Sequence, residues 1–295
     1  MASFKQAKTA LLDAKYERRI RVFLESAEDV RIFSDHWFSH KQDKLRFISA
    51  EGEQIGGGGC KVVINKVAEA NQQAIKAYGI VDRDVLLGDA KLDLFWEADD
   101  DKFHTTKPYG DRIHVLRRWE LENYLLQPEA FAEEAARRVA RSPAPTVSAE
   151  TFLELADDLV QLTALTTCLV ANGKGQPNTG FGVQASDSSA LVEEINRFLK
   201  NQFTGQTPPD FMNDVEKLRT FDCRNVTPEQ RWERLSRILD GKKSLMRLCN
   251  KLGKRVGLES IKHWEEMRGC LANIIVSRQT IDPELLALID GIALS

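Results

Sequence analysis

The sequence predicts an α/β fold in which a mostly parallel sheet is followed by a helical C-terminal region. In the first half, short β-branched runs alternate with helical apolar patterns, which is typical of parallel strands joined by helices. The second half carries only helical patterns, and a proline-containing segment at 143–145 separates the halves. A chain of 295 residues makes one large domain or two ordinary ones. We therefore expect a sheet domain at 1–142 and a helical domain at 146–295.

Four strands are expected in the first half. The runs of strand length with β-branched or aromatic content are residues 20–24, 45–48, 78–81 and 112–116. Helical apolar spacing connects them at 29–38 and 62–76. The acidic and aromatic stretch at 93–101 is expected to be a solvated loop. Helices between successive strands favour parallel pairing with helices on both faces of the sheet.

The second half predicts a series of helices. Their expected ranges are 149–170, 188–201, 227–239, 244–252, 258–275 and 283–294. The last has the clearest start, because Asp282 supplies an N-cap and Pro283 occupies the first helical position.

Composition bounds the function classes. Hydrophobic residues make up 42% and charged residues 29%, which is globular and excludes a disordered or fibrous chain. The formal net charge of −3 gives no overall basic field, so nucleic-acid binding would need a local basic patch. Neither a signal-peptide pattern nor an apolar run long enough for a membrane span is present. We expect a cytoplasmic protein.

Cysteine and histidine patterns suggest no metal site. The five cysteines lack any CxxC spacing, which argues against a disulfide framework and against a structural zinc site. The histidines are scattered, and each is expected to be an ordinary surface or core residue; they are His36, His40, His104, His114 and His263.

Acidic residues follow two of the predicted strands. Glu25 comes directly after the first strand, and Asp82 and Asp84 end the third. The carboxyl ends of parallel strands meet at one edge of a sheet, and residues two apart in an extended chain project to the same side. Carboxylate oxygens suit Mg²⁺ or Mn²⁺. The alternative is that these acids cap helices and orient loops; the additional glutamate after the first strand favours a site.

A basic patch is expected between residues 230 and 269, which hold eleven Lys or Arg against five Asp or Glu. Trp232 and Trp264 lie in the same stretch and would offer stacking surfaces for bases. The candidate nucleic-acid-binding residues are Lys242, Lys243, Arg247, Lys251, Lys254 and Arg255. The alternative is a set of helices with solvated faces and both tryptophans in the core.

Three motifs resemble those of a known family. Glu25 after a strand, followed later by GIVDRD at 79–84, resembles the TOPRIM fold, the metal-dependent domain of topoisomerases, primases and OLD-family nucleases. RRWELENYLL at 117–126 and DGKKSLM at 240–246 resemble elements of stand-alone and OLD-type TOPRIM proteins. The arrangement looks most like the TOPRIM effector of PARIS anti-phage systems. It departs from the pattern at Ser26, where the family usually has glycine.

The resemblance implies a Rossmann-like TOPRIM domain with a Mg²⁺- or Mn²⁺-dependent nuclease site. Glu25 would act as general acid/base or help to hold a metal, Asp82 and Asp84 would bind it, and Glu122 and Glu120 would be added ligands. Two ions on a phosphodiester would activate water and stabilise the leaving oxygen.

The resemblance also implies a biological role. An ABC-type ATPase partner would hold the protein inactive and release it on sensing a phage anti-restriction protein. The released protein would form a homodimer and cut RNA, with tRNA as the favoured substrate. The alternatives are an OLD-like DNA endonuclease and a non-catalytic binding or assembly subunit.

Overall fold

The structure, a computed structural model, describes residues 18–51, 59–138, 146–256 and 263–295. The chain forms two compact units, each assembled from separate stretches. The first contains the described residues up to Asp82 together with 104–116 and 280–295, and the second contains 83–103 and 117–279. The expected domains, 1–142 and 146–295, were contiguous, whereas these units are not. The expected boundary at 143–145 lies outside the described residues.

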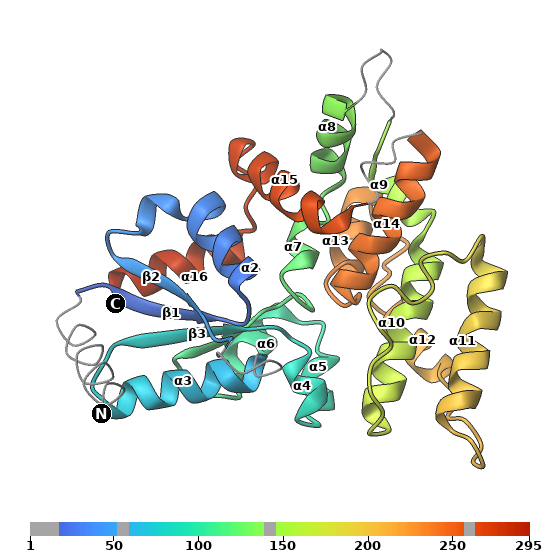
Figure 1. The fold of residues 1–295 in the computed structure, drawn as a ribbon, viewed down its shortest axis with the longest axis horizontal. Coiled ribbons are helices and arrows are strands. Elements are labelled where there is room, and N and C mark those ends of the chain that lie inside the picture. The colour runs from blue at the N-terminus through green and yellow to red at the C-terminus, as the bar shows by residue number, and fades with distance from the viewer. Residues whose placement is uncertain (1–17, 52–58, 139–145, 257–262) are drawn as a thin grey trace, which may run out of the picture. The chain divides into compact units, whose positions relative to one another are not determined.

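The first unit is built on a four-stranded sheet whose paired strands all run parallel. Its strands are β1 (Ile20–Leu24), β2 (Leu45–Ser49), β3 (Ala77–Val81) and β4 (Ile113–Val115), in the order β2-β1-β3-β4. The predicted parallel α/β sheet is therefore confirmed, and the four strands lie within a residue of their expected positions. Figure 1 shows the sheet.

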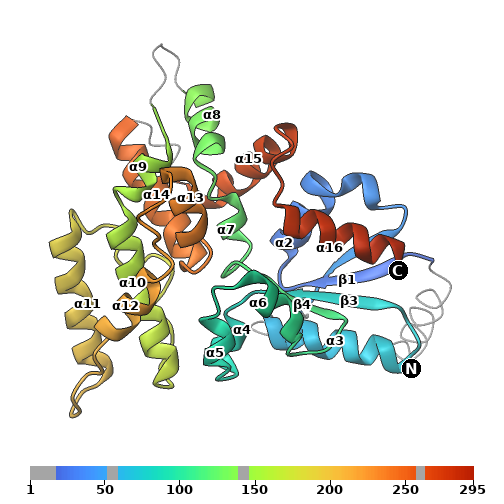
Figure 2. The ribbon, with the colours of Figure 1, turned by 180° about the vertical axis from the view of Figure 1, so that it is seen from behind.

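Helices cover both faces of this sheet. Figures 1 and 2 show α3 (Cys60–Gln72) on one side and α16 (Pro283–Leu294) on the other. On the α16 side, the Tyr78 hydroxyl of β3 donates a hydrogen bond to Ser295 Oγ at 3.0 Å. Lys41 Nζ also forms an ion pair with Asp290 at 2.7 Å. The C-terminal helix is thus part of the sheet unit, whereas the expected division of the chain assigned it to the helical domain 146–295.

The segment after β1 forms a short helical run. It consists of α2 (Ala27–Arg31), the π-helical turn η1 (Ile32–Trp37) and the 3₁₀ turn η2 (Ser39–Lys41). Phe33 and Trp37 bury their rings beneath it, 5.8 Å apart between centroids. The apolar spacing that predicted a helix over 29–38 is therefore confirmed, although part of that helix is wider than an α-helix.

The second unit is helical. Its elements are α4 (Val85–Gly88), α5 (Leu92–Phe95), α6 (Asp100–Thr106, of which 104–106 belong to the first unit), α7 (Glu122–Leu125), α8 (Pro128–Arg138), α9 (Ala149–Leu153), α10 (Ala156–Ala171), α11 (Ser188–Gln202), α12 (Met212–Arg219), α13 (Pro228–Leu235), α14 (Gly241–Val256) and α15 (Trp264–Ser277). Leu159, Leu165 and Leu169 of α10 are fully buried, so this helix lies at the centre of the unit. None of the described helices is both long and apolar enough to cross a membrane.

The expected loop at 93–101 is wrong in part. Residues 92–95 form α5 and α6 begins at Asp100. Phe95 is fully buried and packs edge-on against Trp119, with ring centroids 5.2 Å apart. The many acidic residues of this stretch predicted a solvated loop, although Phe95 within it belongs to the core.

Gly79→Ala is expected to destabilise the first unit by about 1–3 kcal/mol, the usual cost of inserting a methyl group into a packed core. The added Cβ would lie 2.7 Å from Val63 Cγ1 of α3 and 2.9 Å from Ile113 Cδ1 of β4. Urea unfolding followed by circular dichroism measures the change. The control is Gly291→Ala in α16, where the new Cβ meets open space and stability should rise by about 0.5–1 kcal/mol. Equal stability of the two variants would contradict this packing.

Candidate functional site

Glu25 and Asp82 come together where two neighbouring strands end. Glu25 follows β1, Asp82 follows β3, and these strands pair in parallel. The backbone N–H of Asp82 donates to Glu25 Oε1 at 3.4 Å. Both side chains are half-buried. The first unit therefore presents two acidic residues at one edge of its sheet, where ligands of open α/β sheets commonly bind.

Ser26 fixes the chain directly after Glu25. Its hydroxyl accepts a hydrogen bond from Asp29 N at 3.1 Å, and the Asp29 carboxylate accepts one from Ser26 N at 3.1 Å. This reciprocal capping box starts α2 immediately after the glutamate. The serine that departs from the family pattern thus has a structural role of its own, and Glu25 is held between the end of a strand and a capped helix.

Cys60 is a member of this site that sequence reasoning missed. It begins α3, and its thiol donates a hydrogen bond to Glu25 Oε1. Its sulfur also lies 3.7 Å from the carbonyl oxygen of Asp82. The available signal was its place directly after a glycine run, because Gly59 at the helix N-cap has φ of 104°. Cys60 can orient the Glu25 carboxylate.

The residue between the two predicted metal-binding aspartates is structural. Arg83 is buried, and its guanidinium donates hydrogen bonds to Phe95 O at 2.7 Å and to Glu97 O at 2.6 Å. The Phe103 ring lies 4.3 Å from the guanidinium carbon. Arg83 therefore anchors the backbone of the motif. Asp84, two residues after Asp82 in the sequence, is half-buried at the N-cap position of α4. It makes no side-chain capping hydrogen bond to that helix.

Glu120 and Glu122 form an ion cluster inside the second unit. Both are buried, and Lys242 Nζ lies 2.7 Å from Glu120 Oε2 and 3.9 Å from Glu122 Oε2. Arg268 Nη2 lies 3.2 Å from Glu122 Oε1. These cations already neutralise the carboxylates that were predicted as added metal ligands. The arrangement favours a structural role, because a metal would have to displace the lysine and the arginine from two buried carboxylates.

The same cluster joins two of the motifs that carry the family resemblance. Lys242 N donates to Glu120, and the Asn123 amide donates to Leu239 O at 2.8 Å. Gly241 allows this approach, because a Cβ there would collide with Asn123 and lie 2.9 Å from Glu120 Cγ. The segments 117–126 and 240–246 are therefore packed against one another within the second unit.

Two of the predicted nucleic-acid-binding residues are not on the surface. Arg247 is fully buried; its Nη2 pairs with Asp158 at 2.5 Å and its Nη1 donates to Gly182 O at 2.7 Å. Lys243 is 4% exposed and pairs with Asp240 at 2.6 Å. For these two residues the prediction is wrong, because their charges neutralise acids in the core of the unit.

The remaining basic candidates differ in exposure. Lys254 and Arg255 are exposed, and Arg255 pairs with Glu154 at 2.7 Å. Lys251 is half-buried and donates to the carbonyls of Ala185 and Ser186 at 3.0 and 2.8 Å. Burial, and then the neighbouring Arg247, lower the pKa of the Lys251 ammonium. The proposed patch therefore narrows to the end of α14.

Neither tryptophan is a fully open stacking surface. Trp232 is buried, and its indole N–H donates to Leu126 O at 2.8 Å, while Trp264 at the start of α15 is half-buried. The alternative interpretation, in which the tryptophans lie in the core, is correct for Trp232.

Comparisons with known proteins identify no family. No protein-family model matches the chain, and no curated protein matches it.

Arg247→Met is expected to destabilise the protein by about 3–5 kcal/mol, because it leaves the buried Asp158 carboxylate without its ion-pair partner. Lys254→Met, on an exposed position of the same helix, is expected to change stability by no more than about 0.5 kcal/mol. Urea unfolding of both variants measures the difference. An Arg247→Met protein as stable as the wild type would show that Arg247 is not a structural residue.

Proposed function

We propose that this protein is a Mg²⁺-dependent nuclease whose metal is held by Asp82 and Asp84 and whose catalytic residue is Glu25, with Mn²⁺ able to replace Mg²⁺. The observation that carries the proposal is the contact between Glu25 and the backbone of Asp82 at the ends of two adjacent parallel strands. Asp84 lies two residues further along the same motif. Carboxylate oxygens are the ligands that Mg²⁺ prefers, and it keeps waters that a phosphate can displace.

Each residue of the site has a role in this proposal. Asp82 and Asp84 supply oxygen ligands, and Glu25 either completes the ligand set or takes a proton from the attacking water. Cys60, which donates to the Glu25 carboxylate, holds that side chain in one orientation. Bound Mg²⁺ would supply a water of lowered pKa and charge stabilisation for the leaving oxygen.

The biological role in this proposal is that of an anti-phage toxin, and it rests on the motif resemblance. An ABC-type ATPase partner restrains the protein and releases it when a phage anti-restriction protein is sensed. The released protein acts as a homodimer and cleaves RNA, with host tRNA as the favoured substrate, which stops translation. A DNA endonuclease with the same carboxylates and a non-catalytic subunit are the outcomes that the experiment below distinguishes.

Glu25→Gln is expected to abolish nucleic-acid cleavage and toxicity, with a loss of about 10²–10⁴-fold or more if Glu25 acts as the base. The protein is expressed with its ATPase partner and a phage trigger, and RNA and DNA ends are mapped by sequencing. Glu28→Gln, an exposed position on α2, is the matched control and should cleave like the wild type.

The products distinguish the three readings. New tRNA ends that require Glu25 support the ribonuclease, and Glu25-dependent DNA breaks with intact RNA support the DNA endonuclease. Full toxicity of the Glu25→Gln protein would overturn the catalytic role of Glu25. Absence of both products, with the trigger confirmed present, would favour the non-catalytic subunit.

A further inference from the structure

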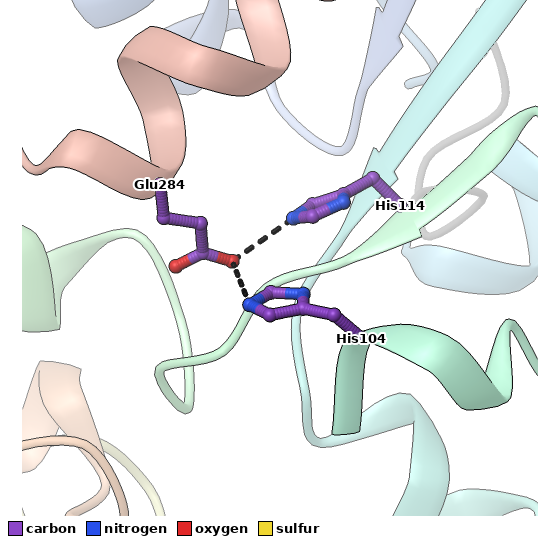
Figure 3. Close-up of side chains that lie close together, drawn as sticks. All are labelled: His104, His114 and Glu284. Carbon is purple, nitrogen blue, oxygen red and sulfur yellow. Dashed lines mark hydrogen bonds and ion pairs between the residues drawn. The ribbon is translucent and has the colours of Figure 1, made fainter. Parts of the chain in front are cut away.

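Three potential metal ligands from separate segments meet within the first unit. They are His104 on α6, His114 on β4 and Glu284 on α16. Their ligand atoms all lie within 4.8 Å of one another. Glu284 Oε1 is 2.9 Å from His114 Nε2 and 3.9 Å from His104 Nε2. Figure 3 shows both rings directing a nitrogen toward the same carboxylate oxygen.

The fold positions each of these side chains. His114 is the middle residue of β4, between the buried Ile113 and Val115, and therefore points to the opposite face of the sheet from them. On α16, the Asp282 carboxylate accepts a hydrogen bond from Glu284 N at 2.9 Å and so fixes the first turn. The sequence signal that predicted the start of this helix is the same feature that places Glu284.

The two imidazoles are held against each other as well as toward the glutamate. Their ring centroids lie 5.5 Å apart, with an angle of 20° between the planes. The Glu284 side chain is only 5% exposed, whereas His104 is 35% exposed. Buried charges in proteins are paired with other charges or coordinate a metal. In this arrangement a divalent cation would bind both Nε2 atoms together with the carboxylate oxygen.

We propose that His104, His114 and Glu284 form a zinc site. Zinc binds histidine nitrogen at about 2.0–2.1 Å and carboxylate oxygen at about 2.0–2.2 Å, so tetrahedral ligand atoms lie about 3.3 Å apart. The two nitrogen–oxygen separations in the structure, 2.9 and 3.9 Å, bracket that value. Imidazole ligands favour zinc over magnesium, which prefers oxygen alone. The fourth position is left for water on the exposed side of His104.

A zinc ion at this site would cross-link distant parts of the chain. His114 and Glu284 are 170 residues apart in the sequence, and the ion would fasten the C-terminal helix to β4. A cross-link that closes a long loop removes much conformational freedom from the unfolded chain. Because metal binding favours the folded state, zinc is expected to raise the Tm of the first unit.

Zinc titration of the EDTA-stripped full-length protein tests the proposal. Isothermal titration calorimetry is expected to show one tightly bound equivalent of Zn²⁺, and Co²⁺ in its place should give the visible absorption of a tetrahedral site. Loss of a residue that only hydrogen-bonds to a metal ligand weakens metal binding by about 10–100-fold. His114→Ala removes a ligand itself, so it should weaken zinc binding by at least about 100-fold. Glu284→Gln preserves the shape of the side chain but removes its charge. It should also weaken zinc binding and abolish the rise in Tm that zinc causes.

Two control variants separate this site from other metal-binding residues. His263→Ala changes an exposed histidine of the second unit and should bind zinc like the wild type. Glu25→Gln should also leave the tight zinc site intact, so loss of the proposed nuclease metal and loss of this site are distinguishable. Absence of tight zinc binding, or binding that persists in both His114→Ala and Glu284→Gln, would overturn the proposal.

Discussion

The parallel pairing of β1 with β3 is the constraint on which the candidate site depends. Its register sets Val22 opposite Tyr78 and Phe23 opposite Gly79, so both strands finish at the same edge of the sheet. Glu25 and Asp82 follow at that edge. Gly79 leaves room for Val63 and Val67 of α3, the helix that begins with Cys60. A shift of one residue in this pairing would turn every side chain of the strand to the other face and separate the acids.

The buried charged residues of the second unit have a structural role, unlike the acids at the edge of the sheet, which we propose as a metal site. Arg83 is fastened by backbone carbonyls, Arg247 by Asp158 and by carbonyls, and Glu122 by Arg268. Each of these ions is neutralised or hydrogen-bonded within the unit, as burial requires. A charged residue in a motif that resembles those of nucleases can therefore stabilise the fold. Its buried ion pairs and hydrogen bonds within the unit distinguish that structural role from ligand binding.

Local patterns predicted the parallel sheet, the start of α16 and the gathering of Glu25 with Asp82, because strand runs, caps and strand-end acids are features of neighbouring residues. They could not predict contacts between distant segments. The basic count of α14 gave no sign that Asp158, 89 residues from Arg247, would bury that charge. His104 and His114 looked like ordinary histidines because the sequence does not indicate that Glu284 packs beside them.

The most direct measurement of the central claim is the position of a bound divalent ion. Crystals of the full-length protein grown with saturating Mn²⁺ would be measured at the manganese absorption edge. We predict an anomalous peak in direct contact with the Asp82 carboxylate and beside Glu25. A map of comparable quality that shows no manganese beside these two residues would contradict the assignment of this sheet edge as the metal centre.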